Sequence, residues 1–278
     1  MGNKIKKEVK KDWWKYFLGI AIIIFHILPI YVLIVMSFKT KTDTSSLLSL
    51  PENIYTGNYT KVFEAGTLLS AVKNTLIITV CVLLIEIAVG GLAAYPLARN
   101  KSKGNNLVKG VILGIMMIPS LSILVGVYSL LVSIHGISTL WGIILVSAAF
   151  GLPMTIYLFT NFISAIPVSL DEASAIDGCS VTQTFFAIIL PQLKPVTVTI
   201  IILNGVGIWN EYAYSLYVLQ KPKLYTLTLT ISQYFSTGGK DVNGAAAAAS
   251  IAIFPLIFAY IFLQKYFIQG TIDSAVKG

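Results

Sequence analysis

Long apolar runs separated by short polar segments dominate the chain. A transmembrane helix needs roughly 20 mainly apolar residues to cross the hydrocarbon layer of a bilayer. Runs of about that length or longer lie at 16–38, 68–98, 107–133, 138–163, 196–219 and 244–267. The pattern predicts an all-α fold: a polytopic bundle of about six transmembrane helices, in one membrane domain over residues 1–278.

The composition supports a membrane protein. Hydrophobic residues make up 56% of the chain and charged residues only 12%, whereas soluble domains carry roughly 25% charge. This excludes an ordinary soluble enzyme and a disordered chain. The net charge of +8 does not indicate nucleic-acid binding, because the basic residues flank the apolar runs instead of forming one patch.

The basic residues also predict the orientation. The first apolar run is longer than the ~7–15 residues of a signal-peptide core, so we expect an uncleaved first helix. With the N-terminus inside, thirteen of the twenty Lys and Arg residues lie on the cytoplasmic side. Because cytoplasmic loops are enriched in Lys and Arg, both termini are predicted to be cytoplasmic.

Reactive side chains are scattered. Cys81 and Cys179 are far apart, as are His26 and His135, and no phosphate-binding loop, nucleophile motif or metal cluster is visible. We therefore expect no catalytic residue, no metal and no bound cofactor in this chain.

The segment 166–195, between the fourth and fifth runs, contains its own helix start and stop signals. Ser169 and Glu172 have the spacing of a capping box, in which each side chain satisfies one free backbone N–H. Gly178 suits the left-handed turn at the end of such a helix. A short surface helix with a glycine turn is predicted here.

A second helix is expected from Ser180, with Gln183 as its reciprocal capping partner, to about Pro191. The first helix carries the acids Asp171, Glu172 and Asp177. Acidic faces are poorly suited to an anionic inner leaflet. We therefore favour docking into a groove of a soluble partner over an amphipathic helix lying on lipid.

The same segment resembles the signature of binding-protein-dependent ABC importer permeases: EAA, three residues, G, nine residues, I-x-LP. The Asp177-Gly178 pair resembles the version found in the carbohydrate-uptake, maltose-type subfamily, and the short outer loops resemble its six-span inner-membrane component. The matching positions are Glu172, Ala173, Ser174, Asp177, Gly178, Ile188, Leu190 and Pro191. Ser174 replaces the second alanine of the motif, and because it is also small, the docking shape should survive.

Further likenesses extend over nearly the whole chain. They are found at 50–59, 93–99, the WNE segment 209–212, 264–270 and the C-terminal tail. The resemblance implies the permease subunit of an ATP-driven importer in a bacterial inner membrane, moving a sugar or oligosaccharide by alternating access. It also implies a sister permease, two cytoplasmic ATPase subunits that bind ATP and Mg²⁺, and an extracytoplasmic solute-binding protein.

Within that resemblance, Glu172 is expected to contact basic residues of the ATPase groove, and Gly178 to let the two helices fold back. The C-terminal tail 274–278 is expected to reach the ATPase dimer interface.

The fifth run offers a candidate solute pathway. At ~100° per residue, Asn204, Glu211 and Ser215 share one stripe of a continuous helix. An adjoining stripe carries the remaining candidates, Asn210, Tyr214 and Tyr217. Polar residues facing lipid are costly, so we expect these faces to look into protein or a water-filled cavity.

Several alternatives stay open. Glu211 is either a cavity acceptor or a structural contact to the sister subunit, and Glu86 is interpreted as structural because Gly90 and Gly91 nearby favour close packing. The solute is either a sugar or another polar compound such as glycerol phosphate. A polytopic membrane enzyme would need a cluster of reactive side chains, which this sequence does not offer. A secondary carrier would need inverted repeats, and none is evident in the sequence.

Overall fold

The computed structural model describes residues 13–236 and 241–275, and every regular element within them is helical. The chain divides into two compact units, Met1–Gly66 with Ile231–Ile253, and Thr67–Thr230 with Phe254–Gly278. Each unit is described by itself. The basic segment 1–12 and residues 276–278 of the predicted C-terminal contact lie outside the described residues.

Four helices of the described part are long and apolar enough to cross a membrane: α2 (Trp13–Ser37), α4 (Thr67–Arg99), α7 (Leu140–Ala165) and the 242–262 part of α14 (Val242–Ala275). Two further pairs of helices pass the same test but are bent, so the number rises to as many as six if each pair is one span. That number agrees with the prediction of about six spans in an all-α fold.

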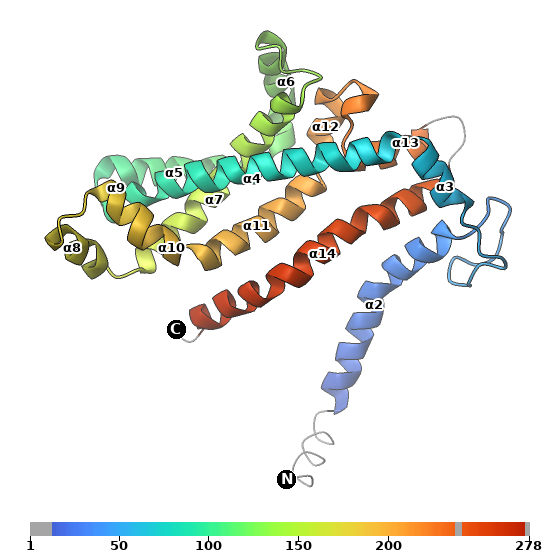
Figure 1. Cartoon of the computed structure of the whole chain (residues 1–278), viewed down its shortest axis with the longest axis horizontal. Coiled ribbons are helices and arrows are strands. Elements are labelled where there is room, and N and C mark those ends of the chain that lie inside the picture. Colours follow the sequence, from blue (N-terminus) through green and yellow to red (C-terminus); the bar gives the residue numbers. More distant parts are fainter. Residues whose placement is uncertain (1–12, 237–240, 276–278) are drawn as a thin grey trace, which may run out of the picture. The chain divides into compact units, whose positions relative to one another are not determined.

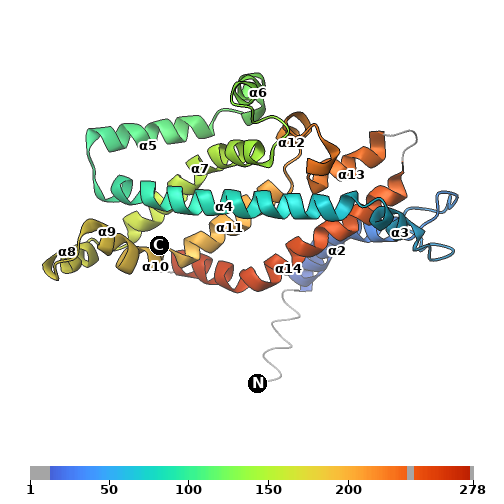
Figure 2. The same cartoon turned by 45° about the horizontal axis from the view of Figure 1, so that its top comes forward.

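The first bent pair replaces the continuous helix predicted at 107–133. Helix α5 (Lys103–Met116) is followed by a 3₁₀ turn, η1 (Ser120–Ile123), and α6 (Leu124–Ser133), with a bend of 92°. Figure 2 shows α6 turned away from α5. The prediction was wrong here because Pro119 has no N–H to continue the helical ladder and is extended.

The second bent pair lies on either side of Leu193, where the helical stretch Val181–Gln192 meets α11 (Lys194–Trp209) at 68°. Helix α11 then ends at Trp209, and a separate short helix, α12 (Ala213–Val218), follows. The continuous helix predicted over 196–219 is therefore wrong. A 3₁₀ turn, η3 (Pro222–Leu224), leads on to α13 (Leu227–Ser236).

In the larger unit, α4 packs mainly along α7 and also against α11 (Figure 1). Gly90 allows the close approach of α4 to α7, because a Cβ there would lie 2.6 Å from the Thr155 Cγ2 atom. Buried apolar side chains from α4, α7, α11 and the segment between α7 and α11 form a core toward the end where α4 finishes; they include Phe159, Ile163, Ile189, Leu193 and Ile200. This core positions the segment that follows α7.

In the smaller unit, a buried amide ties the end of α2 to α3 (Gly57–Glu64). The Asn58 Nδ2 atom donates to the carbonyls of Ser37 and Lys39, at 2.9 Å each. Asn243, at the start of α14, donates to the Lys39 carbonyl at 2.6 Å. Most of α2 remains exposed, so its apolar surface is available to lipid or to another subunit.

Candidate functional site: a coupling loop and a polar cavity

The segment between α7 and α11 forms the predicted pair of short helices around a glycine turn. Helix α8 (Ser169–Ile176) ends before Gly178, which has φ +83°. A single helical stretch follows, composed of α9 (Val181–Thr184), the π-helical turn η2 (Phe185–Ile189) and α10 (Leu190–Gln192). The helix–turn–helix prediction is therefore confirmed.

Only one of the two predicted capping boxes is present. Ser180 accepts from the Gln183 backbone N–H at 3.3 Å, and the Gln183 side chain accepts from the Ser180 N–H at 2.8 Å. The prediction of a capping box between Ser169 and Glu172 is wrong. Val168 already has helical φ and ψ, and its carbonyl accepts from the Glu172 N–H at 3.1 Å, so the helix starts without a side-chain cap.

The outer face of the loop is free for contact. Ile176 is 87% exposed, so its apolar side chain is accessible from outside the loop. The motif residues on or next to α8 that are exposed are Glu172, Ala173, Asp177 and Gly178. At the C-terminal end of the motif, Ile188 and Leu190 are half-buried and Pro191 is exposed.

Ser174, in contrast to the exposed motif residues, is buried and joins the two helices of the loop. It is 2% exposed, and its hydroxyl forms a 2.7 Å hydrogen bond with that of Thr184 on α9. It also donates to the Asp171 carbonyl at 2.8 Å. The sequence predicts only that this residue is small enough for the motif, and its hydrogen bond between the two helices is a structural finding.

A partly buried ion pair fixes α8 to the ends of α4 and α7. The Arg99 Nη2 atom lies 2.8 Å from the Asp171 Oδ2 atom, and the Tyr95 hydroxyl donates to Asp171 Oδ1 at 2.6 Å. Arg99 Nη1 also donates to the carbonyls of Ile163 and Ile166, at 2.9 and 3.0 Å. We call Tyr95, Arg99 and Asp171 the clamp.

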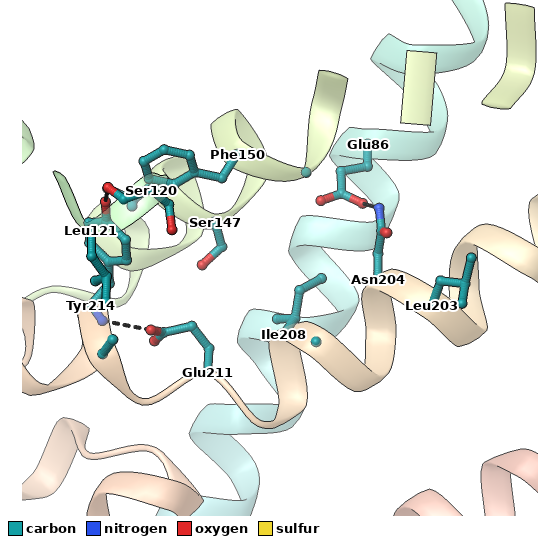
Figure 3. Close-up of a pocket in the computed structure, with 14 residues that line it drawn as sticks. Glu86, Ser120, Leu121, Ser147, Phe150, Leu203, Asn204, Ile208, Glu211 and Tyr214 are labelled. Carbon is teal, nitrogen blue, oxygen red and sulfur yellow. Dashed lines mark hydrogen bonds between the residues drawn. The ribbon is translucent and has the colours of Figure 1, made fainter. Parts of the chain in front are cut away.

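A cavity of about 400 Å³ lies farther along the same unit, between α4, α7, η1, α11 and α12 (Figure 3). Its polar lining side chains are Glu86, Ser120, Ser147, Asn204, Glu211 and Tyr214. Apolar side chains, including Leu121, Phe150, Leu203 and Ile208, cover the rest of the wall. Concave sites with mainly apolar walls and a few convergent polar groups are typical of small-molecule binding.

Glu211 caps α12 at the edge of this cavity. Its Oε1 atom accepts from the Tyr214 backbone N–H at 2.6 Å, and Oε2 accepts from the Ser215 N–H and hydroxyl at 3.0 and 2.6 Å. A carboxylate at a helix N-terminus satisfies free N–H groups and interacts favourably with the helix dipole. This local use explains why the chain can start a new helix after Trp209.

Glu86 lies across the cavity and is fully buried. Its Oε2 atom accepts from Asn204 Nδ2 at 2.6 Å and from the Thr155 hydroxyl at 3.4 Å, so that α4, α11 and α7 meet at one carboxyl group. The sequence favours a structural role for Glu86 over a functional one. The signal available in the sequence was an acid inside an apolar run.

The structure gathers three of the predicted pathway residues and separates the others. Asn204, Glu211 and Tyr214 line the cavity. Ser215 is buried against the Glu211 carboxylate. The two exposed residues are Asn210, which bonds back to its own helix, and Tyr217. The helix break at 210–212 causes this, because it rotates α12 out of the register of α11.

Apolar helices of membrane-spanning length around a mainly apolar cavity with a few polar groups, together with an exposed loop, are consistent with a membrane permease. Residues 86–273 match the model of the binding-protein-dependent transport system inner membrane component family. The chain belongs to this family of transport permeases in the inner membrane.

Relatives are similar over nearly the full length of the chain. The chain is 39% identical over 254 residues to the melibiose/raffinose/stachyose import permease protein MelC of Bacillus subtilis, covering 91% of this chain and 92% of MelC. It is 35% identical to AmyC of Thermoanaerobacterium thermosulfurigenes, a probable permease for starch degradation products, covering 94% and 95%. A solved bacterial ABC transporter that imports the acidic polysaccharide alginate contains a chain of the same fold, with a TM-score of 0.81, 20% identity and coverage of 94% and 98%.

Proposed function

We propose that this chain is a membrane-spanning subunit of an ATP-driven importer that moves a sugar or oligosaccharide into the cell by alternating access. The observation that carries the proposal is the exposed, acidic α8, which holds the importer motif in register and is fixed by the clamp to helices that reach the polar cavity. The oligosaccharide permeases among its relatives support the solute class.

The proposed assembly has a sister permease, two ATPase subunits that bind ATP and Mg²⁺, and a solute-binding protein on the outer side. The loop 166–195 and both termini face the cytoplasm in this proposal. The excess of Lys and Arg on that side supports the orientation. ATP hydrolysis belongs to the ATPase subunits, and this chain converts their movement into a change of access.

The coupling contact is proposed to combine charge and burial. Glu172, in the first turn of α8, offers a carboxylate to a basic residue of the ATPase groove, and Ile176 offers an exposed apolar anchor. When the ATPase dimer closes, α8 moves with its groove. The clamp passes that movement to the ends of α4 and α7.

The solute is proposed to pass the cavity lined by Asn204, Glu211 and Tyr214. By similarity to MelC, raffinose and melibiose are the first solutes to test. Glycerol phosphate is the second candidate, as another polar solute. Lining oxygens and amides can bond solute hydroxyls, and the aromatic and aliphatic side chains beside them can pack against a sugar ring.

The test is an importer reconstituted in vesicles with its ATPases, sister permease and binding protein. Glu172→Lys should lower both raffinose uptake and raffinose-stimulated ATP hydrolysis at least about tenfold, because a reversed charge at a charge-complementary interface disfavours docking. Glu64→Lys is the matched control, since Glu64 is an exposed acid at the end of α3, and it should leave both rates unchanged.

Two results would contradict separate parts of the proposal. If the unaltered importer hydrolyses ATP but accumulates none of the neutral sugars or glycerol phosphates offered, the transport function is wrong. If Glu172→Lys couples as well as the unaltered chain, the function survives and the assigned contact is wrong.

A further inference from the structure

One oxygen of the cavity has no hydrogen-bond partner. The Glu86 Oε2 atom is bonded to Asn204 and Thr155, but the Oε1 atom is buried and unpaired among the described residues. Figure 3 shows the Glu86 carboxyl on the wall opposite Ser147 and Phe150, with one oxygen toward Asn204 and the other toward the cavity. Buried polar atoms are nearly always paired, so this atom needs an explanation.

The neighbouring residues hold the free oxygen in place. A Cβ atom at Gly151 would overlap Oε1 and would lie 2.6 Å from Glu86 Cδ, so only glycine allows the carboxyl this position. Asn204 restrains the other oxygen at 2.6 Å and is itself 3.0 Å from the Thr155 hydroxyl. Three helices therefore fix an unused acceptor at the cavity wall.

The lining indicates which solutes suit that acceptor. The described residues around the cavity include the two carboxyl groups of Glu86 and Glu211 but no Lys, Arg or His. A carboxylate, sulfate or phosphate group there would meet like charge and no counter-ion among these residues, which is unfavourable. A hydroxyl group, in contrast, can donate to Oε1 and pack its carbon skeleton on Phe150 or Leu203.

We propose that this cavity is a solute subsite within the present subunit, selective for uncharged hydroxyl-bearing solutes, in which the free Glu86 Oε1 accepts a hydrogen bond from a solute hydroxyl. The inference rests on the proposed import function and adds a site and a charge preference to it. Glu86 is a binding residue, and Gly151 and Asn204 are the residues that position it.

Solute protection of an engineered thiol tests occupancy directly. Gly207 lines the cavity, and a Cβ atom there would meet nothing within 4 Å, so a Gly207→Cys thiol fits without displacing a neighbour. The assembled importer carries this change with both native cysteines, Cys81 and Cys179, replaced by alanine. The rate of labelling by a water-soluble methanethiosulfonate is measured during ATP turnover with increasing raffinose, and separately with digalacturonate as the acidic probe.

Raffinose should slow labelling in a saturable way, and digalacturonate should not. Adding Glu86→Gln should weaken the raffinose protection about tenfold or more, because the amide oxygen takes over the bond from Asn204 and the cavity receives an N–H donor in place of the acceptor. Gly151→Ala should weaken it similarly by displacing the carboxyl. Gly205→Ala, on the same helix but outside this cavity and with its nearest side-chain atom at 3.5 Å, should leave it unchanged.

The outcomes separate the two proposals. If the importer accumulates raffinose but the Gly207→Cys thiol is labelled equally fast with and without it, the subsite is wrong and the import function stands. Equal protection by digalacturonate refutes the charge preference. If the importer moves no solute at all, the proposed function fails, and the subsite that rests on it fails too. A Glu86→Gln chain that does not assemble leaves the decision to Gly151→Ala and to the protection measured with Glu86 intact.

Discussion

The clamp should determine whether ATP hydrolysis is converted into transport. In Asp171→Ala, the ion pair with Arg99 and the hydrogen bond from Tyr95 are both lost, whereas Glu172 and Ile176 on the outer face of α8 stay in place. Docking to the ATPases should therefore persist. The movement of α8 should reach α4 and α7 less efficiently.

The structure sets the magnitude of this effect. The side chains of Arg99 and Asp171 are 14% and 18% exposed and lie 2.8 Å apart, so solvent weakens their attraction less than at an exposed pair, which is worth about 0–1 kcal/mol. Arg99 keeps two backbone carbonyls as partners after the change, so its charge is not left without partners. A loss of about 2 kcal/mol in the attachment of α8 follows from the usual value of hydrogen bonds to charged groups.

The assay compares ATP hydrolysis and raffinose uptake in the same vesicles, which gives the number of solutes moved per ATP. Asp171→Ala should lower this ratio several-fold while the ATPase subunits still co-purify with the permease. Arg99→Ala and the double variant complete a cycle, and thermal unfolding of the purified importer should show an interaction of about 1–2 kcal/mol between the two residues. An unchanged ratio, or additive effects of the two changes, would refute the clamp.

Three further changes test local features of the larger unit. Gly178→Ala should reduce uptake, because φ +83° strains any L-residue there by about 1 kcal/mol; equal uptake in the alanine variant would mean that the turn tolerates a side chain. Ser180→Ala removes one half of the only capping box in the loop and should cost about 1 kcal/mol, seen as faster amide exchange in α9 and contradicted by unchanged exchange. Gly90→Leu should lower the thermal midpoint by several degrees through collision with Thr155, whereas Gly110→Ala, where a Cβ meets nothing within 4 Å, should not; equal midpoints would refute close packing at Gly90.

The sequence predicts those features that depend on local chemistry. The loop at 166–195 follows from its prolines, Gly178 and the Ser180 cap, all of which act within a few residues. Helix number follows from the length of the apolar runs. The failed capping box shows the limit even here, because Val168 adopted helical angles that no local signal forbids.

The features that escaped prediction depend on partners distant in the sequence or on competing uses of one side chain. Glu86 and Asn204 are 118 residues apart and meet only when α4 and α11 pack. The break after Trp209 arises because Glu211 caps α12 instead of continuing the helix that its period predicts. An apolar run of sufficient length looks the same whether its helix is straight or bent.

The most direct measurement is the labelling of an Ile176→Cys thiol, in a background with Cys81 and Cys179 replaced by alanine, in the permease pair with and without its ATPase subunits. Ile176 is 87% exposed in this chain alone, so labelling should be fast in the permease pair. It should slow at least about tenfold when the ATPases are bound, because the thiol would then be inside their groove. Equal rates in both assemblies, with the ATPases shown to be present, would contradict the assignment of α8 as the coupling element.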